Sequence, residues 1–191
     1  MAEKNPLKIL IGPARLSYAH LLEPTSFGDE GGEKKYSVAF VWPKTDKKLT
    51  KAVQDAIDMA IKSKWEKTVP KKLDSPLRDG DVEKPGDPVY AGCWYVNAKS
   101  SNRPYIVDKA QRPLTDKEEI YSGMFGIGSV SFFAYDKKGV GVGAALNGVM
   151  KTKNGDPLSS QSTPEEDFAD IDPALLDGED DNDPTDLDDL G

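Results

Sequence analysis

The chain has 191 residues, with 25 Lys and Arg, 33 Asp and Glu and a single His, for a formal net charge of -8. The charge is unevenly divided, because residues 164–191 contain 13 acidic and no basic residues. Subtracting those 13 leaves 20 acids against 25 bases in the rest of the chain, a net charge of +5. A basic body with an acidic tail favours a nucleic-acid or membrane partner and a tail that interacts or regulates.

The same composition excludes several classes of protein. No run approaches ~18 apolar residues, as a transmembrane helix requires, and the N-terminus lacks the apolar stretch of a signal peptide. The single cysteine, Cys93, cannot form an internal disulfide, so we expect a reducing cytoplasm. One His and one Cys cannot build a zinc site of three or four His/Cys ligands. We therefore expect no catalysis, no cofactor and no metal.

In chain order, apolar and β-branched runs predict strands at 7–18, 36–42, 90–99, 105–107, 123–135 and 140–151. Gly12-Pro13 predicts a bend or bulge in the first. One helix is expected over about 46–67, where apolar residues from Leu49 to Trp65 recur at helical spacing. Its other face is rich in lysine, which fits either a solvated face or a surface that attracts phosphates. Residues 70–88 are expected to form a long loop, 115–119 a helical turn and 136–139 a hairpin turn.

These elements predict a mainly β fold of five to seven strands with one main helix. Glycines within the long strands indicate strong curvature, since glycine in a strand often marks a bulge or tight bend. A curved barrel of the oligonucleotide-binding (OB) type fits this pattern, and a β-sandwich fits it nearly as well. We expect the barrel domain to cover 1–163 and a disordered acidic tail to cover 164–191.

Aromatic and basic residues interleave along the body. In the strand 90–99, alternation puts Trp94, Val96 and Ala98 on an apolar face and an aromatic ring, an amide and a cation on the other. Grooves for single-stranded nucleic acid use that mixture, because rings stack on bases and cations bind phosphates. The candidate stacking residues are Tyr18, Tyr95, Tyr105, Tyr121 and Tyr135. The candidate phosphate contacts are Arg15, Lys44, Arg78, Lys99 and Arg103, and Asn97 is expected to hydrogen-bond a base or the backbone.

Two other motifs have weaker functional interpretations. Asp79 and Asp81 flank a glycine and could hold a hard cation, as in a metal-dependent nuclease, but no third ligand follows and a structured turn fits better. The glycine-rich run 139–143 lacks the strand–loop–helix context of a nucleotide-binding loop.

The acidic tail alternates acids with single apolar residues, a composition that cannot form a packed core. Three interpretations fit it: a solubility tail, a docking peptide for partner proteins, and an intramolecular mimic of a nucleic-acid strand. A tethered polyanion has a high effective concentration near a basic groove and would compete there with nucleic acid.

Short segments along the body together resemble a known family. They include Ala14-Arg-Leu-Ser-Tyr18, Pro76-Leu-Arg-Asp-Gly-Asp81, Asn97-Ala-Lys99, Tyr121-Ser-Gly123, Leu146-Asn147 and Glu166-Asp-Phe168. In their order and spacing over about 7–170, the chain resembles the bacteriophage single-stranded-DNA-binding proteins first catalogued as a domain of unknown function. The resemblance implies an OB fold, sequence-independent binding of single-stranded DNA in phage replication or recombination, no catalysis, and the cytoplasm of an infected host.

The leading hypothesis is therefore a single-stranded-DNA-binding protein whose acidic tail modulates DNA binding and docks phage or host replication proteins, with no membrane partner. The alternative is a protein-interaction module whose acidic tail mimics DNA and occupies a partner's basic groove.

Overall fold

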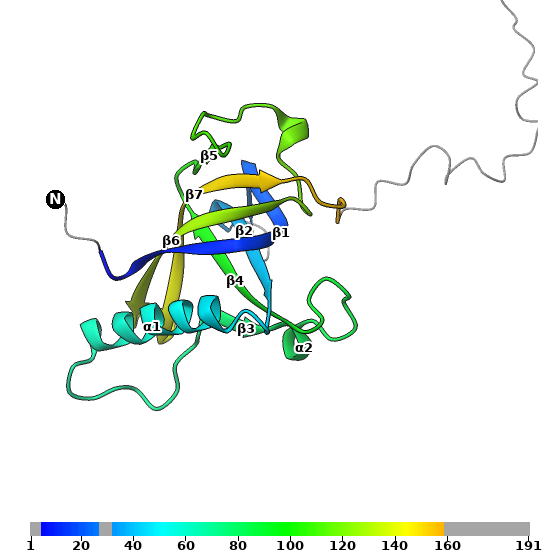
Figure 1. The fold of residues 1–191 in the computed structure, drawn as a ribbon. Coiled ribbons are helices and arrows are strands. Elements are labelled where there is room, and N and C mark those ends of the chain that lie inside the picture. Colours follow the sequence, from blue (N-terminus) through cyan, green and yellow to red (C-terminus); the bar gives the residue numbers. More distant parts are fainter. Residues whose placement is uncertain (1–4, 27–31, 159–191) are drawn as a thin grey trace, which may run out of the picture. The chain divides into compact units, whose positions relative to one another are not determined.

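A computed structural model of the chain describes residues 5–26 and 32–158 (Figure 1). The expected tail, 164–191, and its boundary at 163 lie outside the described residues. The strands are β1 (Lys8–Ser26), β2 (Lys34–Pro43), β3 (Leu77–Asp79), β4 (Cys93–Ser100), β5 (Tyr105–Val107), β6 (Phe125–Tyr135) and β7 (Gly141–Lys153). The helices are α1 (Lys47–Lys64), α2 (Gly80–Glu83) and the 3-10 turn η1 (Lys117–Glu119).

Five of the strands close into a barrel. The strands follow the order β3-β4-β2-β1-β6-β7-β5, and a further parallel pairing of β4 with β7, at Lys99 and Ala145, joins the two sides. β3 and β5 extend the sheet beside β4 and β7. This closure confirms the predicted OB-like barrel, and it rules out the alternative of two separate packed sheets.

β1 is long enough to pair with two strands of the barrel, and it bends at Gly12-Pro13 within the part that pairs with β6. Its first part pairs with β6 and its second part with β2, and the register with β6 shifts between Ile11 and Ala14. Gly12 has a φ of 149°, and a Cβ there would lie 2.7 Å from the carbonyl oxygen of Gly126. The close approach of two backbones therefore requires glycine here, as the sequence predicted.

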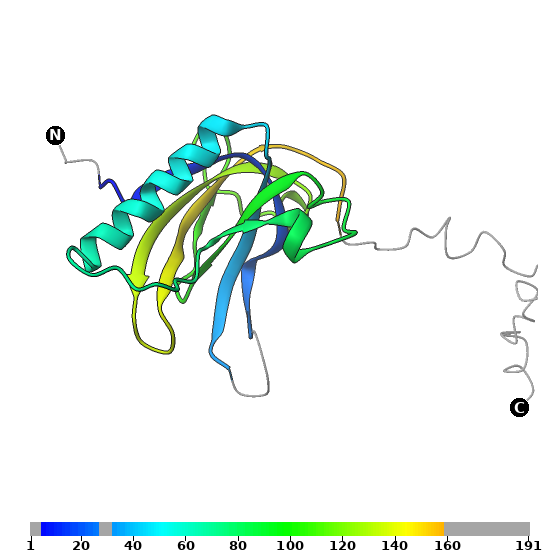
Figure 2. The ribbon, with the colours of Figure 1, turned by 90° about the horizontal axis from the view of Figure 1, so that it is seen from below.

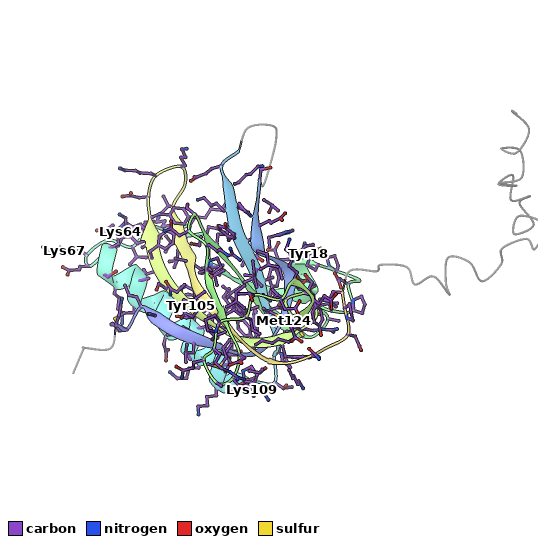
Figure 3. All side chains as sticks on the ribbon, turned by 90° about the horizontal axis from the view of Figure 1, so that it is seen from above. Tyr18, Lys64, Lys67, Tyr105, Lys109 and Met124 are labelled. Atoms are coloured by element: carbon purple, nitrogen blue, oxygen red, sulfur yellow. The ribbon has the colours of Figure 1, made fainter. Side chains whose placement is uncertain are left out.

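α1 lies along the outside of the barrel against β6 and β1 (Figure 2). Asp46 caps its N-terminus by accepting a hydrogen bond from the backbone N–H of Leu49 at 3.1 Å. The apolar stripe predicted from the sequence is the buried face, and it joins the main core; its buried residues are Leu49, Val53, Ala56, Ile57 and Ala60. Met124, labelled in Figure 3, is fully buried in the same core.

The segment 70–88 is more ordered than the sequence predicted. It contains β3, which pairs with β4, and the short helix α2, whose N-cap is Asp79. Both elements are too short to show a periodic pattern and depend on contacts with distant strands. Within residues 5–26 and 32–158, no helix is long and apolar enough to cross a membrane.

Candidate nucleic-acid interface

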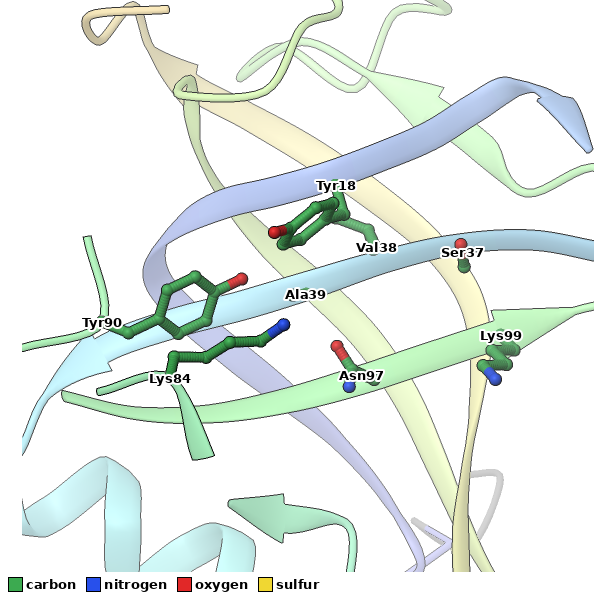
Figure 4. A pocket seen from close by; sticks show the side chains of 8 residues that line it. All are labelled: Tyr18, Ser37, Val38, Ala39, Lys84, Tyr90, Asn97 and Lys99. Carbon is green, nitrogen blue, oxygen red and sulfur yellow. The ribbon is translucent and has the colours of Figure 1, made fainter. Parts of the chain in front are cut away.

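One hollow lies on the outer side of β2 and β4. It has a volume of about 280 Å³ and is drawn in Figure 4 with its lining residues Tyr18, Ser37, Val38, Ala39, Lys84, Tyr90, Asn97 and Lys99. The floor is β2, one wall carries Tyr18 from β1, and Lys84 reaches in from the end of α2. The hollow therefore brings one exposed ring and two lysines together.

A second hollow of about 530 Å³ continues from the first, because Asn97 and Lys99 line both. It runs over β4 and the adjoining ends of β6 and β7, and its side chains include Lys35, Arg78, Phe133 and Tyr135. We call the two hollows together the central groove. Its cations, Lys35, Arg78, Lys84 and Lys99, come from three separated parts of the chain, so only the folded barrel assembles them.

Tyr18 is presented to the groove by an irregular backbone. Its φ is 47°, in the left-handed region, and the pairing of β1 with β2 shifts register just after Ser17. The ring is 54% exposed, and the ammonium of Lys84 lies 5.2 Å from its centroid. Strained residues of this kind persist where surrounding contacts hold them, often at binding sites.

A buried hydrogen bond supports that backbone. The hydroxyl of Tyr90 donates to Oγ of Ser17 at 2.9 Å, and both residues are buried. Burial raises the pKa of Tyr90 to about 12. Tyr90 therefore stays neutral and fixes the residue that precedes Tyr18.

The far end of the groove holds two aromatic rings and an arginine. Phe133 is 48% exposed, and its ring centroid lies 6.3 Å from that of Tyr135. Asp74 accepts hydrogen bonds from Nη2 of Arg78 at 3.0 Å and from the hydroxyl of Tyr135 at 3.4 Å. Burial, and then the charge of Asp74, raises the pKa of the Tyr135 hydroxyl.

Tyr95, a sequence candidate for stacking, lies inside a second core cluster instead. It is 4% exposed, and Tyr90 packs edge-on against it with centroids 5.0 Å apart. Burial raises the pKa of its hydroxyl. Its strand neighbours Asn97 and Lys99 are exposed and line the groove, so the alternation predicted along β4 agrees with the structure. The prediction that Tyr95 is exposed on that face is wrong.

Lys44, a candidate phosphate contact, is held by two carboxylates. Its ammonium lies 2.6 Å from Oδ1 of Asp79 and 2.7 Å from Oδ2 of Asp81, and 5.1 Å from the ring of Trp94. The hydrogen bonds to Asp79 and Asp81 raise the pKa of Lys44, and the bond from Lys44 lowers the pKa of Asp81. The two aspartates therefore hold a lysine, and the described residues contain no cluster of three or more potential metal ligands.

Arg15 and Tyr121 hold the last described segment against the barrel. Arg15 donates to the carbonyl of Asp156 at 2.9 Å, and the hydroxyl of Tyr121 donates to the carbonyl of Gly155 at 2.9 Å. Tyr121 also accepts from the N–H of Gly155 at 3.1 Å. Neither side chain lines the groove, and the contacts of both are with this segment.

Arg103 lines neither hollow but directly follows Asn102, which lines the second one, and Tyr105 lies apart from the groove. Both are exposed, and Tyr105 lines a different hollow on β1, β5, β6 and β7, together with Leu10, Ile127 and Met150. Figure 3 shows Tyr18 and Tyr105 at separate positions on the barrel. Of the eleven predicted site residues, the groove unites Tyr18, Arg78, Asn97, Lys99 and Tyr135.

Sequence reasoning missed Lys35, Lys84 and Phe133 as groove residues. Alternation along β6 places Phe133 on the same face as Tyr135, and that signal was available. Lys84 gives no signal in the sequence, because it follows a helix of four residues, which is too short to show a periodic pattern. Cys93 is partly buried, and burial raises the pKa of its thiol.

The chain is similar to several phage proteins. A curated relative, putative protein p50 of Acyrthosiphon pisum secondary endosymbiont phage 1, is 33% identical over 163 residues, which are 80% of this chain and 87% of the relative. The single-stranded DNA-binding protein from bacteriophage Enc34, solved in complex with ssDNA, is 30% identical with a TM-score of 0.71, over 80% of this chain and 90% of that one.

A more distant structure shares the fold. The single-stranded DNA binding protein encoded by bacteriophage T7 is 17% identical with a TM-score of 0.55, over 87% of this chain and 95% of that one. The family described as Enterobacter phage Enc34, ssDNA-binding protein, matches residues 7–183. The match confirms the resemblance seen in the sequence: the chain belongs to this family of phage single-stranded-DNA-binding proteins.

Proposed function

We propose that the chain binds single-stranded DNA along the central groove without sequence preference. One observation carries the proposal: two adjoining hollows on one side of the barrel bring exposed aromatic rings and cations together. Rings accept any base by stacking, and cations bind the phosphates that every strand carries. The side of an OB barrel formed by its second and third strands, here β2 and β4, is where such folds bind oligonucleotides.

The roles of the groove residues follow from their positions. The rings of Tyr18, Phe133 and Tyr135 stack on bases, and Asn97 hydrogen-bonds a base or the backbone. The phosphate contacts are Lys35, Arg78, Lys84 and Lys99. Arg78 exchanges its ion pairs with Asp74 and Glu83 for a contact with a phosphate, because Arg78 is partly exposed, both carboxylates are exposed, and such pairs are weakly held in water.

The test is the binding of labelled oligo(dT) and of mixed-sequence strands over a salt series. For single strands the logarithm of the affinity is expected to fall with the logarithm of salt with a slope of about -0.7 per phosphate contacted. Affinities within a few-fold across sequences support sequence-independent binding. Failure of a chain ending at Thr163 to bind any strand at ~50 mM salt would refute the proposal.

The acidic tail, residues 164–191, is proposed to modulate that binding. Its 13 acids oppose a body of net charge +5, and they are tethered to it at high effective concentration. Deleting Pro164–Gly191 is expected to tighten DNA binding most at low salt, where the polyanion is least screened. Equal affinities with and without the tail at low salt would contradict this role.

We infer further that the same tail docks proteins of phage replication or recombination in the cytoplasm of an infected host. The alternative is that the tail mimics DNA in a partner's basic groove while the barrel is only a scaffold. Capturing basic-grooved replication proteins on the isolated tail, beside oligo(dT) binding by a chain ending at Thr163, separates the two. The groove favours the first, because a scaffold has no need of exposed rings set among cations.

A further inference from the structure

A basic patch lies just beyond the end of the central groove. It consists of seven exposed lysines from two parts of the chain: Lys62, Lys64, Lys67, Lys71 and Lys72 from the end of α1 and the loop after it, and Lys137 and Lys138 from the β6–β7 hairpin. Only three acids, Glu66, Asp74 and Asp136, occur within segments 62–74 and 136–138. Among the described residues, Lys64 is the only one of the seven in an ion pair.

Three contacts hold the two groups of lysines together. Nζ of Lys64 lies 3.5 Å from Oδ1 of Asp136, which ties α1 to the hairpin. The N–H of Asp74 donates to the carbonyl of Val140 at 3.0 Å, and the N–H of Val142 donates to the carbonyl of Asp74 at 2.9 Å. Figures 2 and 3 show the end of α1, with Lys64 and Lys67, on the side of the molecule where the hairpin lies.

The patch continues the groove. Asp74 and Tyr135 line the second hollow, and Lys72 and Lys137 each lie two residues along the chain from one of them. Two residues span at most about 7.6 Å between Cα atoms, so both lysines begin within a side-chain length of the groove. A DNA strand that leaves the groove over Tyr135 therefore passes within reach of both lysines.

Ordinary structural roles account for only part of the patch. Lysines in the last turn of a helix stabilise its negative end, which explains Lys62 and Lys64. That effect does not extend to Lys71, Lys72, Lys137 or Lys138, which are outside the helix. The patch also contains an aromatic ring, since Nζ of Lys64 lies 5.9 Å from the ring of the partly exposed Trp65.

We propose that this patch is a second section of the DNA path, which binds the phosphates of a single strand after it leaves the central groove. The proposal rests on the proposed function, and it predicts a longer footprint than the groove provides. Single-stranded DNA is the favoured occupant over the acidic tail because the patch adjoins the groove and repeats its pairing of lysine with an aromatic ring.

The experiment compares full-length chains on oligo(dT) of roughly 6 and roughly 20 nucleotides, which bracket the site sizes of OB folds. One variant carries Lys71→Gln, Lys72→Gln and Lys137→Gln. Its matched control carries Lys47→Gln, Lys48→Gln and Lys51→Gln, which remove the same charge from the other end of α1. Lys138 is left unchanged because its φ of 58° lies in the left-handed region, so a substitution there could also change the backbone of the hairpin.

On the long strand the patch variant is expected to bind more weakly than the control, with a salt slope up to about 2 smaller than that of the unmodified chain. On the short strand all three chains are expected to agree within a few-fold. If the patch variant and the unmodified chain have the same salt slope on the long strand, the inference is overturned. Equal losses of affinity in the patch variant and the control would overturn it as well. Tighter binding by the patch variant would overturn it too, by assigning the patch to the acidic tail.

The outcome separates this inference from the proposed function. If the unmodified chain binds neither strand, the proposed function itself fails. If the unmodified chain binds both strands but the patch variant and the control bind the long strand equally well, the proposed function is supported and the second section of the DNA path is refuted.

Discussion

Phe133 lies directly over Gly143 on the neighbouring strand. The two residues pair across β6 and β7, and a Cβ added to Gly143 would clash with Cζ of Phe133. The glycine thus gives the ring a seat against the sheet, while 48% of the side chain remains exposed to the central groove. A ring fixed in this way is a ready platform for a base, because little side-chain freedom is left to lose on binding.

Replacing Phe133 by Ala is therefore expected to weaken binding to oligo(dT). Base–aromatic stacking contributes roughly 1–3 kcal/mol per base, which corresponds to a loss of about 5- to 150-fold in affinity. The salt slope should stay unchanged, because no phosphate contact is removed. Fluorescence anisotropy over a salt series measures both quantities, and Leu10→Ala, another exposed apolar side chain outside the groove, is the matched control.

Gly143→Ala tests the position of the Phe133 ring against the sheet, and it leaves the ring itself in the protein. The new methyl group must push aside the far end of an exposed side chain, so the free energy of unfolding should change little. The affinity should nevertheless fall, since the ring is displaced. An affinity equal to that of the unmodified chain would show that the position of Phe133 is unimportant for binding.

Tyr105 offers the opposite test. Its ring also lies over a glycine, Gly148, where an added Cβ would clash with it. It is 54% exposed, but it lines a hollow outside the central groove. If the DNA path is confined to the groove and the basic patch, Tyr105→Ala should bind oligo(dT) like the unmodified chain. A loss as large as that of Phe133→Ala would extend the DNA path to this side of the barrel.

The hydrogen bond between Tyr90 and Ser17 should contribute to the stability of the fold. In Tyr90→Phe the buried hydroxyl of Ser17 loses its donor, at a cost of about 1–3 kcal/mol in the free energy of unfolding. In the double variant with Ser17→Ala neither polar group is left unpaired, so part of the loss should be recovered. Urea unfolding of the four chains of this cycle measures the coupling, and strictly additive losses would mean that the hydrogen bond contributes nothing.

Much of the fold could be predicted from local sequence patterns. Helical spacing from Leu49 to Trp65 placed α1 within a few residues of its observed bounds, and Gly12-Pro13 marked the bend in β1. β3 and α2 could not be predicted in this way. They are three and four residues long, and pairing with β4 and the contacts of Lys44 position them.

The site was only partly predictable for a related reason. Alternation along β4 correctly set Asn97 and Lys99 on the outer face with Tyr95. It could not show that Tyr90, from the loop before the strand, packs over Tyr95 and buries it. Period-two patterns identify the face of a sheet, but what covers that face is decided by tertiary contacts.

The direction in which Asp81→Asn changes the affinity for DNA distinguishes two roles for Lys44. If its ammonium binds phosphate, removing the competing carboxylates should free it, and Asp81→Asn should tighten DNA binding. If instead it holds α2 in place, Lys44→Met and Asp81→Asn should both loosen α2 and the position of Lys84 behind it. The geometry favours the second role, since two carboxylates and the Trp94 ring already surround the ammonium.

We expect both variants to bind oligo(dT) more weakly and neither to reduce the salt slope by the ~0.7 of a lost phosphate contact. The pH dependence of the ion pair between Lys44 and Asp81 has a definite sign. Asp81 has a lowered pKa, so its contribution is present above the ordinary value of 3.8 and is lost as the pH falls through the folded value. Lys44 has a raised pKa, so its contribution is present below 10.5 and is lost as the pH rises through its folded value. The fluorescence of Trp94, taken as the difference between the unmodified chain and a Trp94→Phe variant, should report both limits. A signal that stays constant through the acidic limit would contradict the contribution of the ion pair between Lys44 and Asp81.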